Sequence, residues 1–217
     1  PQYNLGLLYV GGQGGPQDYT KARQWFENAA AQGHAGAQYN LGTLYRDGQG
    51  GPQDYATARQ WFEKAAAQGV APAQNNLGLL YYNGQGVPQD YAKARQWFEK
   101  SAVQGHPRAQ YNLGVLYDFE KGVPQDYATA RQWYEKAAAQ GHAGAQNNLG
   151  GLYEFGHGVT QDYVRAYMWY NVAAANSTGD AHKDVAAENR DEIAGRMTSA
   201  QIAEAQKLAR EWKPLKQ

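Results

Sequence analysis

The chain has 217 residues, with 26 glycines, 17 tyrosines, 6 tryptophans and no cysteine, and its 20 lysines and arginines balance its 20 aspartates and glutamates. The lack of cysteine excludes disulfide frameworks, thiolate metal sites and cysteine nucleophiles. The zero net charge argues against binding to nucleic acid or to anionic membrane surfaces, which need a basic excess. A mean hydropathy of −0.77 and no apolar stretch near ~20 residues predict no membrane span.

A constant period of 36 residues runs through most of the chain. Leucine recurs at this spacing at Leu5, Leu41, Leu77, Leu113 and Leu149, and one aspartate and one tryptophan of each repeat keep the same register. Such self-similarity is typical of repeat proteins, in which each repeat is one supersecondary unit. We divide the chain into repeats 1–36, 37–72, 73–108, 109–144 and 145–180, followed by an alanine-rich, charged segment, 181–217.

Each repeat is predicted to begin with an amphipathic helix. In the second repeat, Ala37, Leu41, Leu44 and Tyr45 recur at i, i+4, i+7 and i+8 and therefore share one stripe of a helix. Gly42 lies beside that stripe. Because glycine lowers helix propensity, we expect Gly42 to be there to allow a neighbouring helix to approach closely.

A second helix is predicted after a turn rich in glycine and proline. Asp54 is the predicted N-cap, because its carboxylate can accept from the free amides of the first turn. Gly69 is expected to end the helix in the left-handed conformation. The predicted buried stripe of this helix consists of Tyr55, Ala58, Trp61, Phe62 and Ala65.

Neither helix can bury its apolar stripe alone, so successive hairpins must stack. The predicted fold is all-α, an α/α right-handed superhelical solenoid of five 36-residue helical hairpins over 1–180. Segment 181–217 is predicted to add a capping helix pair to the same domain. Its second helix would begin at Thr198, with Gln201 completing a capping box, and would pack through Ile202, Ala205, Ala209 and Trp212.

The repeated pattern A-Q-x-N-L-G-x-L-Y-x-x-G-x-G-x-P-Q-D-Y-x-x-A-R-Q-W-F-E-K-A-A-x-Q-G resembles the Sel1-like repeat, a branch of the tetratricopeptide-like helical hairpins, over about 1–180. The resemblance implies a bacterial type of non-catalytic scaffold or adaptor that binds other proteins. Departures are mild: Thr57 and Thr129 replace a usual lysine, and Glu120 replaces a glycine. The paired cysteines of some secreted relatives are absent.

Positions 3, 7, 10 and 11 of each repeat differ between repeats and lie opposite the leucine stripe, which predicts an exposed face. The resemblance implies that first helices line a concave surface, where an extended peptide would bind. Aromatic residues there are typical of interface anchors, and the asparagine at position 4 of every repeat offers a carboxamide to a peptide backbone. The predicted partner-binding residues are Tyr39, Asn40, Thr43, Arg46, Asn75, Asn76, Leu79, Tyr82, Tyr111, Asn112, Val115, Asp118, Phe119, Asn148, Glu154 and Phe155.

Two other interpretations of this face stay open. The tyrosines could be neutral surface residues, and the asparagines could satisfy loop carbonyls of a neighbouring hairpin. Charge on the face also changes along the chain, because Asp118, Glu120 and Glu154 lie near Phe119 and Phe155. This distribution suggests a partner with apolar side chains and a positive end.

No catalytic or metal-binding constellation is evident. Stacked helices lie ~8–10 Å apart, which is too far for histidines of neighbouring repeats to share one zinc ion. We therefore interpret the recurring His34, His106 and His142 as surface loop residues. The glycine-rich segments lack the strand and the lysine of a phosphate loop, and no serine stands in an S-x-x-K pattern. We predict no enzymatic activity, no metal and no cofactor.

Two further functions stay as alternatives. Some cysteine-rich relatives suggest a cell-wall-related hydrolase or a β-lactam-binding protein. A self-associating structural protein would use the face of the first repeat, where Pro1 replaces an alanine and no polar helix precedes. Because the chain begins with Pro1, we expect it to derive from a longer or processed polypeptide. The cellular location is unknown, and the resemblance favours periplasm or secretion.

Overall fold

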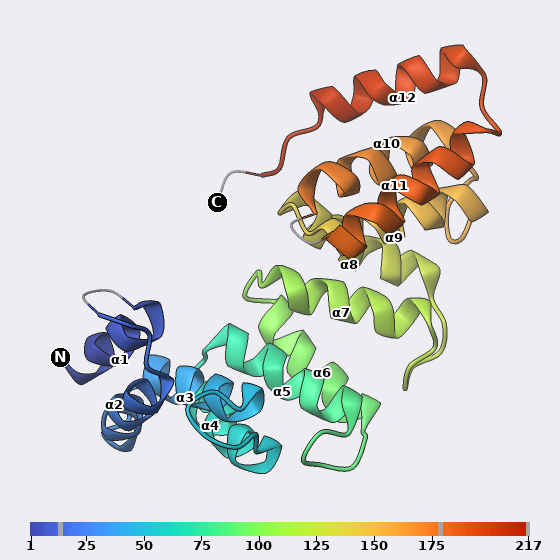
Figure 1. Cartoon of the computed structure of the whole chain (residues 1–217). Helices are drawn as coiled ribbons and strands as arrows, with labels where there is room; N and C mark the ends of the chain where they lie inside the picture. Colours follow the sequence, from blue (N-terminus) through green and yellow to red (C-terminus); the bar gives the residue numbers. More distant parts are fainter. Residues whose placement is uncertain (13–14, 178–179, 216–217) are drawn as a thin grey trace. The chain divides into compact units, whose positions relative to one another are not determined.

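The computed structural model of the chain describes residues 1–12, 15–177 and 180–215. All regular elements among these residues are helices, which confirms the predicted all-α solenoid class of stacked helical hairpins (Figure 1). The chain forms two compact units, Pro1–Gln104 and Gly105–Gln217, and each is described by itself. None of the helices in the described ranges is both long enough and apolar enough to span a membrane.

The first unit holds three helical hairpins in chain order. The hairpins are α1 with α2, α3 with α4, and α5 with α6, and the second helix of one hairpin packs on the first helix of the next. This order agrees with the predicted stacking. The helices are α1 (Gln2–Gly11), α2 (Tyr19–Ala31), α3 (Ala35–Asp47), α4 (Tyr55–Ala67), α5 (Ala71–Asn83) and α6 (Tyr91–Ala102).

The second unit holds two hairpins of the same kind and two further helices. The hairpins are α7 with α8 and α9 with α10, and both α11 and α12 pack on α10. Helix α11 also contacts α9, the first helix of the last repeat. The helices are α7 (Pro107–Asp118), α8 (Tyr127–Ala139), α9 (Ala143–Phe155), α10 (Tyr163–Asn176), α11 (Asp180–Ala194) and α12 (Ser199–Glu211).

Close packing inside each hairpin depends on the glycine predicted to serve it. A β-carbon added at Gly42 would lie 2.7 Å from ring atoms Cδ1 and Cε1 of Phe62, well inside van der Waals contact. Leu41 and Phe62 are fully buried on the two sides of this contact. The glycine therefore lets α3 approach the aromatic side chain of α4, as the sequence predicts.

The turn within each hairpin is held by a glutamine and an aspartate. In the second repeat, Gln53 Nε2 donates to the Arg46 carbonyl at 2.7 Å, and the Asp54 amide donates to the Tyr45 carbonyl at 2.9 Å. The Asp54 carboxylate accepts from the Thr57 amide at 3.0 Å, which confirms the predicted N-cap. This arrangement fixes the end of the first helix and the start of the second.

Glutamine side chains connect one repeat to the next, which sequence reasoning did not predict. Gln38 Nε2 donates to the Ala30 carbonyl of the preceding repeat at 3.2 Å. Its Oε1 accepts from Gln68 Nε2 at 2.7 Å, and Gln68 also donates to the Gly33 carbonyl. Gln38 is buried, so these bonds satisfy polar atoms that water does not reach.

The recurring histidines, which the sequence indicates as surface loop residues, lie just before a first helix, exposed or part-buried, and act as its N-cap. Nδ1 of His34, His106 and His142 accepts the backbone amide three residues later, at 3.1, 3.3 and 3.2 Å. Two of the rings also stack on a tyrosine of the preceding first helix, His34 on Tyr3 and His142 on Tyr111. The capping role follows because a neutral imidazole nitrogen can accept a hydrogen bond.

The last helix begins as predicted. Thr198 and Gln201 form a reciprocal capping box at the start of α12. Ala205 is fully buried, and Trp212 makes an edge contact with Trp169 of α10, with ring centroids 6.1 Å apart. These contacts seat α12 against α10.

Candidate protein-binding pocket

A pocket of about 460 Å³ lies in the second unit, among the ends of α7 and α9, the start of α8, helix α10, helix α11 and the residues just after α11. Five of the predicted binding residues line it: Asp118, Phe119, Asn148, Glu154 and Phe155. The structure adds Gln125, Tyr127, Asn147, Gly151, Leu152, His157, Tyr170, Asn189, Glu192 and Arg196. Five of the eight predicted residues of the last two repeats therefore line one pocket, whereas Tyr111, Asn112 and Val115 do not.

Two phenylalanines provide exposed apolar surface at this pocket. Phe119 is 57% exposed and Phe155 is 60% exposed, although large aromatic side chains are rarely left in solvent. His157 stacks on Tyr127 with ring centroids 4.4 Å apart, and Phe155 lies 5.8 Å from the same imidazole. The pocket thus has aromatic side chains from two repeats.

Each acidic residue of the pocket at repeat position 10 is bonded to a tyrosine of the second helix. Tyr134 donates its hydroxyl to Asp118 Oδ2 at 2.9 Å, and Tyr170 donates to Glu154 Oε2 at 2.8 Å. The first three repeats have phenylalanine at the tyrosine position and no acid at position 10. In the last two repeats, both residues of this contact pair therefore differ from those of the first three repeats.

Burial determines the electrostatics of these pairs. Burial raises the pKa of the Asp118 carboxyl above its ordinary value, against the opposing effects of the Tyr134 hydrogen bond and the charge of His157. Burial, with the adjacent carboxylate, also raises the pKa of Tyr134 and of Tyr170. Both tyrosines are therefore neutral hydrogen-bond donors at physiological pH.

Glu154 is buried, which corrects the expectation that it is an exposed charge. It is 6% exposed and pairs with Arg196, whose Nη1 lies 3.3 Å from Glu154 Oε1. Arg196 also pairs with Glu192 at 2.7 Å. Glu154 is buried because α11 and the residues just after it lie against α9 at position 10 of the last repeat.

A missing side chain at Gly151 leaves room in the pocket. The same repeat position holds leucine, threonine or valine in the other repeats. A β-carbon added at Gly151 would meet only the Tyr170 hydroxyl oxygen, at an ordinary contact distance of 3.7 Å. Packing therefore does not require glycine here, in contrast to Gly150, whose added β-carbon would lie 2.5 Å from the Tyr170 ring.

The tyrosines predicted as exposed anchors are half-buried packing residues, so that part of the prediction is wrong. Tyr39 packs on Phe62 at 6.1 Å and belongs to the apolar cluster of the second repeat. Tyr111 stacks on His142 at 4.6 Å, and Tyr82 makes an edge contact with Tyr91. These rings fill space between helices, which explains their occurrence without invoking a ligand.

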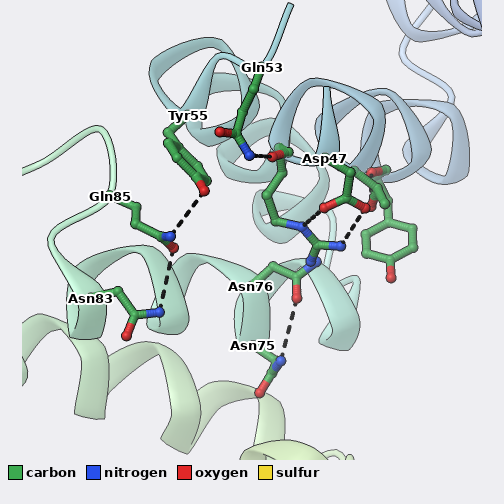
Figure 2. A network of polar contacts seen from close by, with 10 residues as sticks. Asp47, Gln53, Tyr55, Asn75, Asn76, Asn83 and Gln85 are labelled. Atoms are coloured by element: carbon green, nitrogen blue, oxygen red, sulfur yellow. Dashed lines mark hydrogen bonds and ion pairs between the residues drawn. The ribbon is translucent and has the colours of Figure 1, made fainter. Parts of the chain in front are cut away.

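The predicted residues of the first unit lie on α3 and α5, and several are engaged internally (Figure 2). Arg46 forms a two-pronged ion pair with Asp47, at 2.7 and 2.9 Å, and its carbonyl accepts from Gln53. Asn75 and Asn76 are buried rather than exposed, and Asn75 Nδ2 lies 3.5 Å from Asn76 Oδ1. The part-buried members are Asn40, Thr43 and Leu79, and in the second unit Asn112 and Val115.

The asparagines at position 4 do not share one set of partners. Asn148 Nδ2 donates to the Tyr134 hydroxyl at 2.9 Å, a contact that only tyrosine offers. The Nδ2 of Asn76 is buried and has no hydrogen-bond partner among the described residues. Asn148 therefore has a structural role: its carboxamide donates to the same Tyr134 hydroxyl that donates to Asp118.

Sequence reasoning missed the residues of the pocket that lie outside the first helices. Arg196 follows α11 and belongs to no repeat, so the period does not reveal it. The sequence did offer a signal for the two tyrosines, because Tyr134 and Tyr170 replace the phenylalanine of the other repeats in the two repeats whose position 10 is acidic. Across the described part of the chain, no group of three or more histidine, aspartate or glutamate side chains is arranged to hold a metal ion.

The fold and the repeat geometry define a helical-hairpin repeat protein of the α/α solenoid class. A sequence model of the Sel1 repeat matches residues 2–34, 35–70, 71–106, 107–142 and 143–177, and the chain belongs to this family. From the second repeat on, the matched repeats begin two residues earlier than predicted, at the residue after the N-cap in α3, α5, α7 and α9.

Solved structures of the same fold support this assignment. A Sel1 repeat protein from Oxalobacter formigenes is 37% identical with a TM-score of 0.75, over 83% of this chain and 74% of that one. The protective antigen c5321 of uropathogenic Escherichia coli is 32% identical with a TM-score of 0.61, over 97% of this chain and 52% of that one. A putative Sel1 repeat protein from Klebsiella pneumoniae is 27% identical with a TM-score of 0.55, over 89% and 91%. The curated proteins include no match to this chain.

Proposed function

We propose that this chain is a non-catalytic adaptor that binds a partner protein through the first-helix face of its repeats, with the pocket of the second unit as the principal contact. Sel1 repeat proteins generally mediate protein–protein interactions and generally have a scaffold role. Two residues at positions that vary between repeats, Phe119 and Phe155, are exposed at the end of the first helices of the last two repeats.

The observation that carries the proposal is the pair of exposed phenylalanines beside a concave, partly acidic pocket. Stacking does not need Phe119 or Phe155, since each remains more than half exposed. Aromatic side chains next to a pocket are typical of residues that dominate binding free energy. Gly151 increases the open volume where a side chain would fit.

The test is retention of partner proteins from the source cell on the immobilised chain. We expect Phe119→Ala combined with Phe155→Ala to lose a partner that the wild type retains, with a dissociation constant raised about tenfold or more. A matched control combines Val103→Ala with Leu215→Ala, which truncates two apolar residues outside the first helices that are 77% and 68% exposed. A partner retained equally by the phenylalanine variant and the wild type would contradict the proposal.

A further inference from the structure

The Glu154 carboxylate, at repeat position 10, forms an ion pair with the guanidinium of Arg196, a residue outside the repeats. Arg196 reaches this carboxylate from the segment after α11, at 3.3 Å, and keeps a second ion pair with Glu192. The Glu154 carboxylate also accepts from Tyr170. A tyrosine hydroxyl and an arginine therefore together satisfy a position-10 carboxylate that is almost fully buried.

Asp118 is the equivalent carboxylate one repeat earlier, and it has only the first of these two partners. It accepts from the Tyr134 hydroxyl at 2.9 Å. Within the described ranges, no lysine or arginine forms an ion pair with it, and the charge of His157 offsets only part of the effect of burial on its pKa. Asp118 lines the same pocket as Glu154, and burial makes its charged form costly. A cation supplied by another molecule would compensate that cost.

The aromatic residues of the pocket suit a planar cation. Phe119 and Phe155 offer exposed rings, and Tyr127 with His157 forms a stacked pair. The chain itself shows that its tyrosines accept such packing, because the Arg23 guanidinium carbon lies 3.4 Å from the centroid of the Tyr45 ring. Guanidinium groups stack on aromatic faces and are less strongly hydrated than ammonium groups.

We propose that the pocket binds an arginine side chain of the partner protein, with the guanidinium donating to Asp118 and the flanking apolar residues of the partner packing on Phe119 and Phe155. This inference rests on the proposed adaptor function and names the chemistry of its partner. Arginine is favoured over lysine because its planar fork pairs with a carboxylate and stacks on a ring at the same time.

The experiment uses acetyl-Leu-Arg-Leu-amide as the probe, titrated into the ¹⁵N-labelled chain and followed by NMR. We expect saturable shifts of the backbone amides of Asp118, Phe119 and Phe155. The matched peptide with citrulline keeps the shape of arginine without its charge, and it should bind about tenfold more weakly, the loss of one charge-assisted hydrogen bond. A peptide with lysine in place of arginine should also bind more weakly. Equal binding of the citrulline peptide or of the lysine peptide, or no saturable shift with the arginine peptide, would overturn the proposal.

Two variants assign the effect to one carboxylate. Asp118→Asn keeps an acceptor for the Tyr134 hydroxyl and should reduce arginine-peptide binding about tenfold. Asp47→Asn is the control, because Asp47 already pairs with Arg46 in the first unit. Circular dichroism verifies that both variants fold. If a captured partner depends on Phe119 and Phe155 but not on Asp118, the adaptor function stands and the arginine assignment fails.

Discussion

Two adjacent glycines of α9 should respond in opposite ways to alanine. Either substitution removes a glycine from a helix interior, which alone stabilises the fold by about 1 kcal/mol. At Gly151 the new methyl group meets nothing closer than 3.7 Å. We therefore expect Gly151→Ala to raise the free energy of unfolding by about 1 kcal/mol.

Gly150→Ala places a methyl carbon 2.5 Å from ring atoms Cδ1 and Cε1 of Tyr170, about 1 Å inside normal carbon contact. The ring is 2% exposed and its hydroxyl is bonded to Glu154, so it has little room to move. Overpacking of this kind costs about 1–3 kcal/mol, and the short distance favours the upper end. Because the propensity gain is common to both variants, Gly150→Ala should be less stable than Gly151→Ala by at least this amount.

Urea unfolding followed by circular dichroism measures the difference, since the midpoints of two variants with equal slopes report their relative stability. We expect stability to decrease in the order Gly151→Ala, wild type, Gly150→Ala. A Gly150→Ala variant as stable as Gly151→Ala would refute the assignment of Gly150 to close helix packing and of Gly151 to open space.

Three further predictions concern stability. Because burial raises the pKa of Asp118, Asp118→Asn should be at least as stable as the wild type in urea titrations at pH 7. The difference should shrink as the pH falls and vanish only below about pH 3.8, the unfolded-state pKa; a large loss of stability at pH 7 would contradict this. Burial, with the charge of Arg108, lowers the pKa of His106 below the ordinary value for histidine, so the unfolded chain binds the proton first and stability falls as pH drops below about 6.5. His106→Asn, a cap that does not titrate, should flatten thermal melting temperatures between pH 7 and 5 relative to wild type, and an unchanged slope counts against the N-cap. Tyr170→Phe removes a hydrogen bond to the buried Glu154 carboxylate and should cost about 1.5–3 kcal/mol in urea unfolding; no loss would show that the bond is dispensable.

The fold could be predicted because every repeat must meet the same packing and capping requirements in order to stack on its neighbours. Gly42 and Asp54 recur at fixed spacing since helix approach and helix capping are needed in every hairpin. The histidine caps were missed because imidazole is a less usual cap than aspartate or serine. The glutamine contacts between repeats were missed because a constant polar residue does not reveal its partner.

The candidate site could be predicted only in part. The concentration of acid and phenylalanine in the last two repeats correctly indicated Asp118, Phe119 and Phe155 as neighbours. Variation between repeats was a poor guide to exposure, because Tyr39 varies and still packs on Phe62. Burial of Glu154 depends on the segment after α11, which lies outside the repeated pattern.

The most direct test of the proposed adaptor site fills its open space without changing its charge. Gly151→Leu introduces the residue that two other repeats hold at this position, and Thr20→Leu, at an exposed position of the second helix α2, is the control outside the proposed binding face. Isothermal titration against the captured partner should show that Gly151→Leu weakens binding at least about tenfold while Thr20→Leu leaves it unchanged. Undiminished binding to a folded Gly151→Leu variant would show that the partner does not use this pocket.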